Sequence, residues 1–397
     1  MVRLGGPLAA LLLGVIAAEA RAQPDESRSG GARIEAGGET GPRFALEVGG
    51  RFQARLTGRW GEEGGDPFTP AIRRARVDLE GFAFHPAVRF DVQLALSPAD
   101  LGLDEDGLRY TPLLDATLEL AFHRDVALVI GQSKRPFARE RIISSAELAL
   151  VDRSIVDGAL GLDRDLGVML RSRDFLGLGR LRYAVGVGTG EGREGGFGED
   201  GGLAWFGRVE LLPFGLFDDG TQADLERSTR PRLALGAAYA FLDRARGLDG
   251  LEGPRPVDGG TTDIHAAAFD VLALWRGWTL EADLIWRRGR RDAGDAAVAP
   301  DAPRNGVGAF LQIGALVPGV DLELVARVGA LWPRRAGAPA TGLARRSELG
   351  AGLAWYLDGH DLSLHLDAFH VAEGRLLDAG EQRLRLQLEV RLDALAP

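Results

Sequence analysis

The sequence RLRLQLEVRL, residues 383–392, decides the fold, because charged or polar residues alternate in it with leucine or valine without a break. Successive side chains of a β-strand point to opposite faces, so this segment predicts a strand with one ionic and one apolar face. The same alternation recurs at residues 71–84, 278–288 and 361–373. The chain therefore reads as a succession of two-faced strands.

Sixteen such segments can be counted, and the connections between them alternate in length. Short connections fall at 85–86, 123–124, 276–277 and 318, and long ones at 60–70, 98–111, 133–164, 189–202, 243–261, 289–305 and 332–344. Short turns at one rim and long loops at the other are typical of outer-membrane barrels. Residues 213–231 are the exception, because they should form a short periplasmic turn and yet are long. The predicted strands are 44–59, 71–84, 87–97, 112–122, 125–132, 165–173, 180–188, 203–212, 232–242, 262–275, 278–288, 306–317, 319–331, 345–356, 361–373 and 381–393.

A soluble sheet packed against a second layer would also alternate. Here the polar faces are charged along nearly every strand, and no helical periodicity supplies a covering layer. An open sheet of this size would expose its edges, whereas closure in lipid pairs every backbone group. We therefore expect an all-β protein, a 16-stranded antiparallel transmembrane β-barrel, with tryptophans near the strand ends at the membrane interface.

Composition excludes several classes of function. The formal net charge of −10 argues against a nucleic-acid partner, and the absence of cysteine excludes disulfides and thiolate sites. Nothing resembles a Ser/His/Asp triad, and the histidines are not grouped as metal ligands would be. We expect no enzyme activity, no catalytic residue, no metal and no cofactor.

The N-terminus predicts export. Residues 1–22 combine a positive start, an apolar run and the A-x-A sequence Ala20-Arg21-Ala22, as in a signal peptide. Residues 23–43 have no periodicity and are expected to form a flexible periplasmic arm. Residues 44–393 are then the barrel domain, located in the bacterial outer membrane with lipid around it.

The longest break in the strand pattern is 133–164, the predicted third loop. It mixes apolar runs such as 146–151 with several cations, among them the only lysine of the chain. A loop of this composition should pack against something, so we expect it to fold inward and narrow the pore. The predicted constriction and anion-binding residues are Lys134, Arg135, Arg139, Arg141, Arg153 and Arg164.

This stretch resembles the phosphate-selective porin O and P family of outer-membrane channels. The matching positions are Gly131, Lys134, Pro136-Phe137, Glu140, Ser144-Ser145, Arg153-Ser154, Arg164-Asp165 and Gly167-Val168. The resemblance implies a sixteen-stranded channel, usually a homotrimer, with an inward third loop. Two features depart from the family: the chain ends in Asp393-Ala-Leu-Ala-Pro397 without a final aromatic residue, and it has a single lysine. Phosphate selectivity therefore does not follow from the resemblance alone.

A second group of cations shares predicted lumen faces on the first, second and last strands, which closure would bring together. Rings or ladders of arginine favour anions in pores, and a guanidinium group can bind phosphate through two parallel hydrogen bonds. Alternatively, these cations pair with Asp78, Glu80, Asp91 and Glu389, which would give a weakly selective lining. The predicted basic wall is Arg51, Arg55, Arg59, Arg74, Arg76, Arg383 and Arg385.

These features predict an outer-membrane porin for passive diffusion of small hydrophilic solutes. Small anions, with phosphate and polyphosphate among them, are the expected partners. The alternative is a non-conducting outer-membrane barrel with a structural or binding role.

Overall fold

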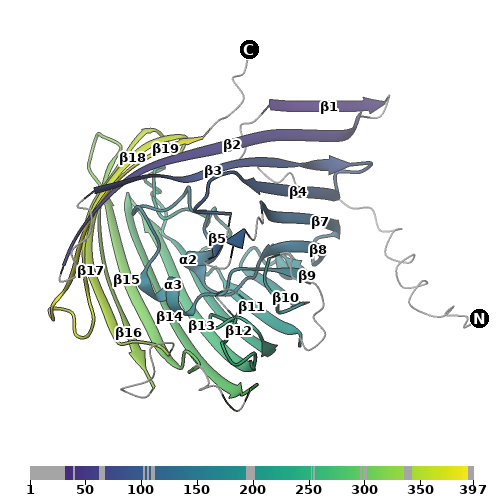
Figure 1. Ribbon diagram of the computed structural model, residues 1–397. Helices are drawn as coiled ribbons and strands as arrows, with labels where there is room; N and C mark the ends of the chain where they lie inside the picture. Colours follow the sequence, from purple (N-terminus) through teal and green to yellow (C-terminus); the bar gives the residue numbers. More distant parts are fainter. Residues whose placement is uncertain are drawn as a thin grey trace, which may run out of the picture.

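A computed structural model describes residues 32–391 apart from 39–40, 62–67, 102, 105–106, 109–111, 194–201, 252, 254, 296, 298–301 and 335–341. Its strands form one antiparallel sheet that curls into a barrel (Figure 1). All sixteen predicted strands are present, with ends that differ by a few residues from those expected. They are β2 (Gly41–Trp60), β3 (Phe68–Ala83), β4 (Val88–Ala95), β7 (Leu113–His123), β8 (Val126–Lys134), β9 (Arg164–Ser172), β10 (Leu181–Gly188), β11 (Ala204–Leu211), β12 (Arg232–Ala245), β13 (Thr261–Trp275), β14 (Trp278–Asp292), β15 (Gly306–Leu316), β16 (Leu322–Pro333), β17 (Arg346–Asp358), β18 (Leu362–Ala372) and β19 (Gly380–Arg391).

The barrel closes where the sequence pattern predicted it. Strand β19 pairs antiparallel with β2, with Leu386 opposite Leu56 and Arg391 opposite Arg51. Each remaining strand pairs with its neighbours in the chain, β9 with β10 included. The fold is therefore a closed 16-stranded antiparallel β-barrel, and closure removes the open edges that a flat sheet would have.

The outer surface is apolar and ringed by tryptophan. On β19, Leu384, Leu386 and Leu388 are all exposed, at alternate positions. All seven tryptophans of the chain are exposed, between 39% for Trp286 and 59% for Trp278. Exposed leucines between aromatic girdles are the surface that lipid requires. The protein is thus a transmembrane barrel. In the described part of the chain, no helix is long and apolar enough to cross a membrane.

The inner surface differs from the expectation that charged residues line it everywhere. On β12 and β13 most inward positions are small or apolar and buried, among them Ala240, Ala266 and Ala268, although the buried Asp270 of β13 also points inward. They lie in a hydrophobic cluster with Phe137, Val156 and other residues of the third loop. The reason is that this sector of the wall faces protein and not water.

The third loop, residues 135–163 between β8 and β9 and hereafter the inner loop, folds into the barrel. Two short helices, α2 (Arg139–Ile142) and α3 (Ile155–Leu160), lie inside the ring of strands in Figure 1. Helix α3 contacts β14, β15, β16 and β17. The inward third loop expected from the sequence is confirmed.

Part of the segment expected to be a flexible arm, residues 23–43, forms a strand. Strand β1 (Ala32–Gly38) pairs with β2 from Ala32 opposite Val48 to Gly38 opposite Gly41. Strand β19 reaches only Arg391 opposite Arg51, so β1 continues along the same edge of β2. Arg33 and Glu35 do alternate with Ala32, Ile34 and Ala36, but this pattern covers only five residues of a Gly-rich segment, and the open edge of β2 provides the partner. The predicted signal peptide, residues 1–22, the first part of the arm and the last residues of the predicted barrel domain, 392–393, lie outside the described residues.

Two further short elements lie among the connections. Strands β5 (Leu103–Asp104) and β6 (Gly107–Leu108) pair with each other between β4 and β7. A single 3-10 turn, η1 (Phe175–Gly177), lies between β9 and β10.

Candidate constriction of the lumen

The inner loop is held in shape by its own polar residues. Ser154 caps α3, since its Oγ accepts a hydrogen bond from the Asp157 backbone N–H at 3.2 Å. The same hydroxyl donates to Glu140 Oε2 at 2.6 Å, and the Ser154 backbone N–H donates to Glu140 Oε1 at 2.8 Å. Glu140 thus joins α2 to the start of α3. Burial raises the pKa of its carboxyl to about 7, with repulsion from Asp157 in the same direction and Arg327 opposing.

Glycines in the wall make room for the loop. A Cβ at Gly308 would lie 2.8 Å from Val156 Cγ1, and one at Gly352 would lie 2.7 Å from Leu150 Cδ2. Both glycines occupy inward positions, so the loop's apolar side chains approach the backbone of β15 and β17. This close packing fixes the loop against the wall.

Four of the six predicted loop cations, Lys134, Arg141, Arg153 and Arg164, lie close enough to repel one another, and all six are engaged by protein groups. Lys134 Nζ donates to the carbonyls of Ile142 and Ile143 at 3.3 and 3.2 Å. Arg135 donates to the Asp165 carbonyl at 2.5 Å and lies 4.8 Å from the Phe206 ring centroid. Arg135 thus joins the start of the loop to its end, and Lys134 joins the start to the end of α2.

The other four loop cations pair mainly with carboxylates. Arg139 contacts Asp270, Glu210 and Asp219, each at 2.8 Å. Burial alone would lower the pKa of Arg139, but the three carboxylates raise it above its ordinary value. Its positive charge is therefore permanent and fully compensated. The remaining contacts are Arg141 with Asp157 at 2.7 Å and Asp163 at 3.2 Å, Arg153 with the Glu140 and Ile143 carbonyls at 2.8 and 2.7 Å, and Arg164 with Asp115 at 2.6 Å.

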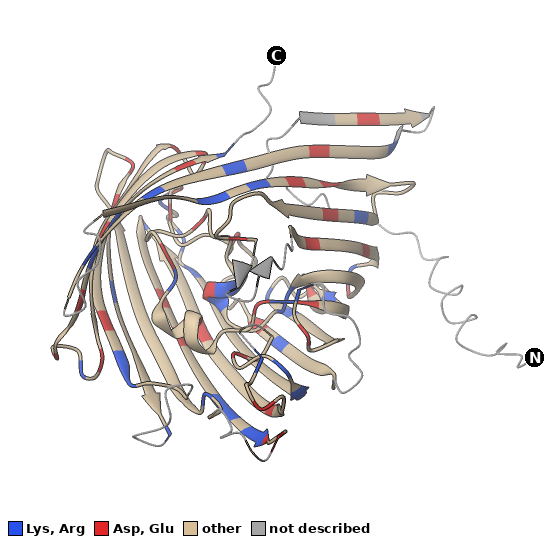
Figure 2. Ribbon diagram, viewed as in Figure 1, with Lys and Arg blue, Asp and Glu red and all other residues tan. Residues whose placement is uncertain are grey.

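The predicted basic wall is assembled by closure of the barrel. Register places Arg51 opposite Arg76 on one side and opposite Arg391 on the other, and it places Arg59 opposite Arg383. Figure 2 shows basic and acidic residues interspersed on the strands and on the segments inside the barrel. The wall is thus a cluster of cations that neighbours acidic groups.

Much of this wall is covered by the tip of the inner loop. Arg55 donates to Asp152 Oδ2 at 2.9 Å and to the Val151 carbonyl at 3.0 Å, and Gln53 donates to the Ser145 carbonyl at 3.2 Å. Arg51, 6% exposed, has Ser144 Oγ at 3.4 Å, and its Nε is buried without a partner in the described structure. The other contacts of the wall are Arg74 with Gln53 at 2.7 Å, Arg76 with Asp100 at 2.7 Å, Arg385 with Asp367 at 2.7 Å and Arg383 with Glu381 at 2.6 Å.

Asp152 lies at the centre of this cluster. Its side chain is 27% exposed and is 2.9 Å from Arg55 and 3.8 Å from Arg74. Burial would raise the pKa of Asp152, but Arg55, Arg74, Arg73 and Arg385 hold it well below its ordinary value. One carboxylate that water reaches is therefore surrounded by four guanidinium groups.

The acidic partners of the arginines were not identified from the sequence. Asp78, Glu80, Asp91 and Glu389 were the expected partners, whereas Asp100 and Asp152 of the connecting segments take much of that role. Sequence separation explains the miss, because the Arg55–Asp152 pair spans 97 residues. Only the inward folding of the loop creates that contact.

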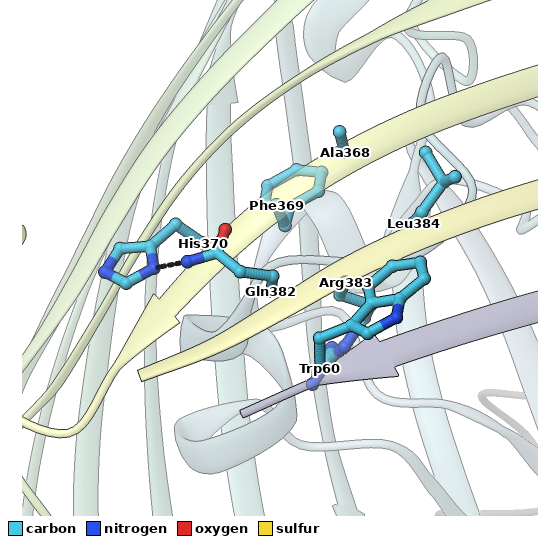
Figure 3. Close-up of a pocket in the computed structure, with 7 residues that line it drawn as sticks. All are labelled: Trp60, Ala368, Phe369, His370, Gln382, Arg383 and Leu384. Atoms are coloured by element: carbon cyan, nitrogen blue, oxygen red, sulfur yellow. Dashed lines mark hydrogen bonds between the residues drawn. The ribbon is translucent and has the colours of Figure 1, made fainter. Parts of the chain in front are cut away.

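A hollow of about 340 Å³ lies at the end of β2, β18 and β19 near the long loops, as Figure 3 shows. Trp60, Gln382 and His370 form one row across these strands, with Gln382 donating to His370 Nδ1 at 2.6 Å. They share the outward parity of Leu384 and Ala368, which also line the hollow. It is thus mainly a feature of the outer surface and not of the lumen.

Comparison with known proteins finds structural likeness only. No family model matches the chain, and no curated protein matches it. The anion-selective porin from Comamonas acidovorans superposes with a TM-score of 0.57 at 13% identity, over 88% of this chain and 100% of that one. OmpF of Salmonella typhi superposes with a TM-score of 0.55 at 13% identity, over 88% of this chain and 98% of that one. The outer-membrane channel DcaP of Acinetobacter baumannii superposes with a TM-score of 0.55 at 12% identity, over 90% of this chain and 99% of that one. These similarities support a porin fold, and the phosphate-selective family is not confirmed.

Proposed function

We propose that the protein is an outer-membrane porin through which small hydrophilic solutes diffuse passively, with a preference for anions. A closed barrel of sixteen strands is wide enough for an aqueous channel. The inward Asp78, Glu80 and Thr117 of β3 and β7 are half-buried, and Asp91 of β4 is exposed. Water therefore has a route in front of this sector. The proposal involves no chemical step.

The observation that carries the anion preference is the environment of Asp152. Arg385 also pairs with Asp367, and Arg73 with Asp100, but Arg55 and Arg74 share the single carboxylate of Asp152, which leaves an excess of positive charge where the inner loop meets the wall. A permeating anion would be stabilised there by the arginines that Asp152 does not neutralise, and a cation would be repelled. Arg59 and Arg383, opposite each other towards the long loops, would attract anions to the same region.

Phosphate and polyphosphate are the solutes we propose first within this class. Guanidinium groups bind phosphate oxygens through paired hydrogen bonds. The local resemblance to phosphate-selective porins supports the same choice. The predicted loop cations, Lys134 and Arg135 included, would act chiefly by holding the loop. By analogy with porins we propose a homotrimer in outer-membrane lipid.

One observation favours a second candidate function, a barrel that does not conduct. The inner loop buries Phe137, Ile143, Leu150 and Leu160 inside the lumen, each at 2% exposure or less. An apolar core within the barrel is also what a plug would have. Such a barrel would serve a structural or binding role.

Current recordings on the purified protein in planar bilayers separate the two. Ohmic steps whose reversal potential in a KCl gradient indicates anion preference support the porin. Folded barrels without current support the plug, and cation preference refutes the role of the arginines.

A further inference from the structure

The connection between β11 and β12, residues 212–231 and hereafter the periplasmic segment, turns into the barrel from the rim opposite the inner loop. It is the segment that broke the alternation of short and long connections. Leu212, Gln222, Ala223 and Asp224 are buried, each at 3% exposure or less. A simple turn at the rim would not be buried in this way, so the segment must pack against other parts of the same chain.

Gln222 is the main point of contact with the inner loop. Its backbone N–H donates to the Glu147 carbonyl at 3.0 Å, and its Oε1 accepts from the Ala149 N–H at 3.0 Å. The same amide donates to Glu281 Oε2 at 2.5 Å and accepts from Gln312 Nε2 at 3.1 Å. One buried side chain thus links the tip of the inner loop to β14 and β15.

Two further links join the segments. Asp219 pairs with Arg139 of the inner loop at 2.8 Å and with Arg182 of β10 at 2.7 Å. Thr221 Oγ1 lies 3.0 Å from His360 Nε2, which is 3.1 Å from Glu147 Oε2. The contact therefore extends along both segments.

The periplasmic segment is itself fixed to the wall. Ala223 and Leu225 pack with Leu316, Ala354 and Tyr356. Asp224 accepts hydrogen bonds from the backbone N–H groups of Gly277 at 2.7 Å and Ser228 at 3.0 Å. A segment held on the barrel by apolar and polar contacts is a rigid support for what rests on it.

We infer that the periplasmic segment is a second constriction element, and that Gln222 is the positioning residue that holds the tip of the inner loop in the lumen. Residues 144–152 reach Arg51, Gln53 and Arg55 on the far wall, so the position of the tip sets the width of the passage beside β2 and β3. The inner loop alone would be supported from one rim only. With Gln222 it is supported from both.

This inference rests on the proposed channel, and its test uses the full chain with one readout that needs no current. In Gln222→Ala the Ala149 amide loses its acceptor, so hydrogen exchange of residues 144–151 should quicken roughly tenfold, the effect of one buried hydrogen bond. Conductance should rise and become noisier. Asp219→Asn, at a partly exposed residue that threatens folding less, should act in the same direction. Gln382→Ala on the outer surface is the matched control and should change neither readout.

Unchanged exchange and unchanged current in both Gln222→Ala and Asp219→Asn would overturn the inference. If the wild-type protein carries no current, the proposed channel fails, and the exchange measurement alone then decides whether Gln222 holds the tip.

Discussion

The Arg55 guanidinium on β2 lies 2.9 Å from the Asp152 carboxylate of the inner loop, and this pair joins the first strand of the barrel to the loop that folds across its lumen. Arg74, Arg73 and Arg385 surround the same carboxylate closely enough to lower its pKa. The pair thus links the loop tip to β2 and places one carboxylate among these guanidinium groups.

Neutralising this carboxylate should strengthen anion preference. Asp152→Asn leaves Arg55 and Arg74 without their counter-charge, whereas Arg73 and Arg385 keep Asp100 and Asp367. We therefore expect the anion-to-cation permeability ratio to rise by the equivalent of about 1 kcal/mol, or roughly fivefold. Arg55→Ala should lower the ratio. Reversal potentials in a KCl gradient measure both, with Asp292→Asn on the outer surface as the control. A lower ratio in Asp152→Asn would refute the assignment.

Adding side-chain volume beneath the loop should displace it. Gly308→Val places atoms where Val156, Leu160 and Leu331 already lie within 3.0 Å of a Cβ, and overpacking of this kind costs about 1–3 kcal/mol. We expect faster hydrogen exchange in α3 and altered conductance. Gly158→Ala within α3 is the control, because nothing lies within 4 Å of its Cβ. Equal effects of the two substitutions would contradict the packing described here.

The stability of the inner loop in its position inside the barrel should depend on pH through Glu140. Its pKa is raised from 4.5 to about 7, so the folded loop retains a proton that the released loop gives up between these values. The protonated Glu140 therefore contributes fully to the stability of the loop in the lumen below pH 4.5, and this contribution is lost as pH rises towards 7. Exchange protection of α3, corrected for intrinsic rates, should fall across this window in wild type and not in Glu140→Gln. A wild-type protection that rises instead would show that the ion pair with Arg327 dominates.

The contribution of Asp152 to the stability of the loop tip depends on pH in the opposite sense. Because its pKa is depressed, its stabilising pairs are present above pH 3.8 and are lost as pH falls below that value. Acid should therefore release the tip at Asp152 while Glu140 still holds α3. Residues 144–152 should lose protection below pH 4 in wild type, and Asp152→Asn should abolish this step.

The two faces of a strand should respond differently to charge. Leu386→Arg puts a cation into hydrocarbon, where the cost near the bilayer midplane is about 2–4 kcal/mol. Thr117→Arg, at an inward position, should cost much less. Urea unfolding in lipid vesicles measures the difference in unfolding free energy. Equal costs would argue against a lipid-facing row of leucines.

Alternation was enough to predict the sixteen strands and their closure, because an exposed Leu386 and an inward Arg385 follow from period two alone. Strand β1 was missed because the alternation of Arg33 and Glu35 with Ala32, Ile34 and Ala36 covers only five residues of a Gly-rich segment, which pairs through an open edge of β2. The expectation that inward residues are charged and face water was wrong for much of β12 and β13. Ala266 and Ala268 point inward as period two requires, but they face the loop and not water.

The cations of the candidate site were found from the sequence and their partners were not. Lys134, Arg135 and Arg139 stand out because the loop mixes cations with apolar runs, so composition indicated them. Asp270, which neutralises Arg139, lies 131 residues away on another strand, and Gln222 has no feature that marks it. Contacts of this kind arise only when segments distant in the sequence meet inside a closed barrel.

The most direct test is the current through purified, folded protein in a planar bilayer with a KCl gradient, alongside a heat-modifiability gel that confirms folding. We predict discrete ohmic steps and a reversal potential on the anion side, which Arg55→Ala shifts towards zero. A folded barrel that stays silent, or one that prefers potassium to chloride, would contradict the account.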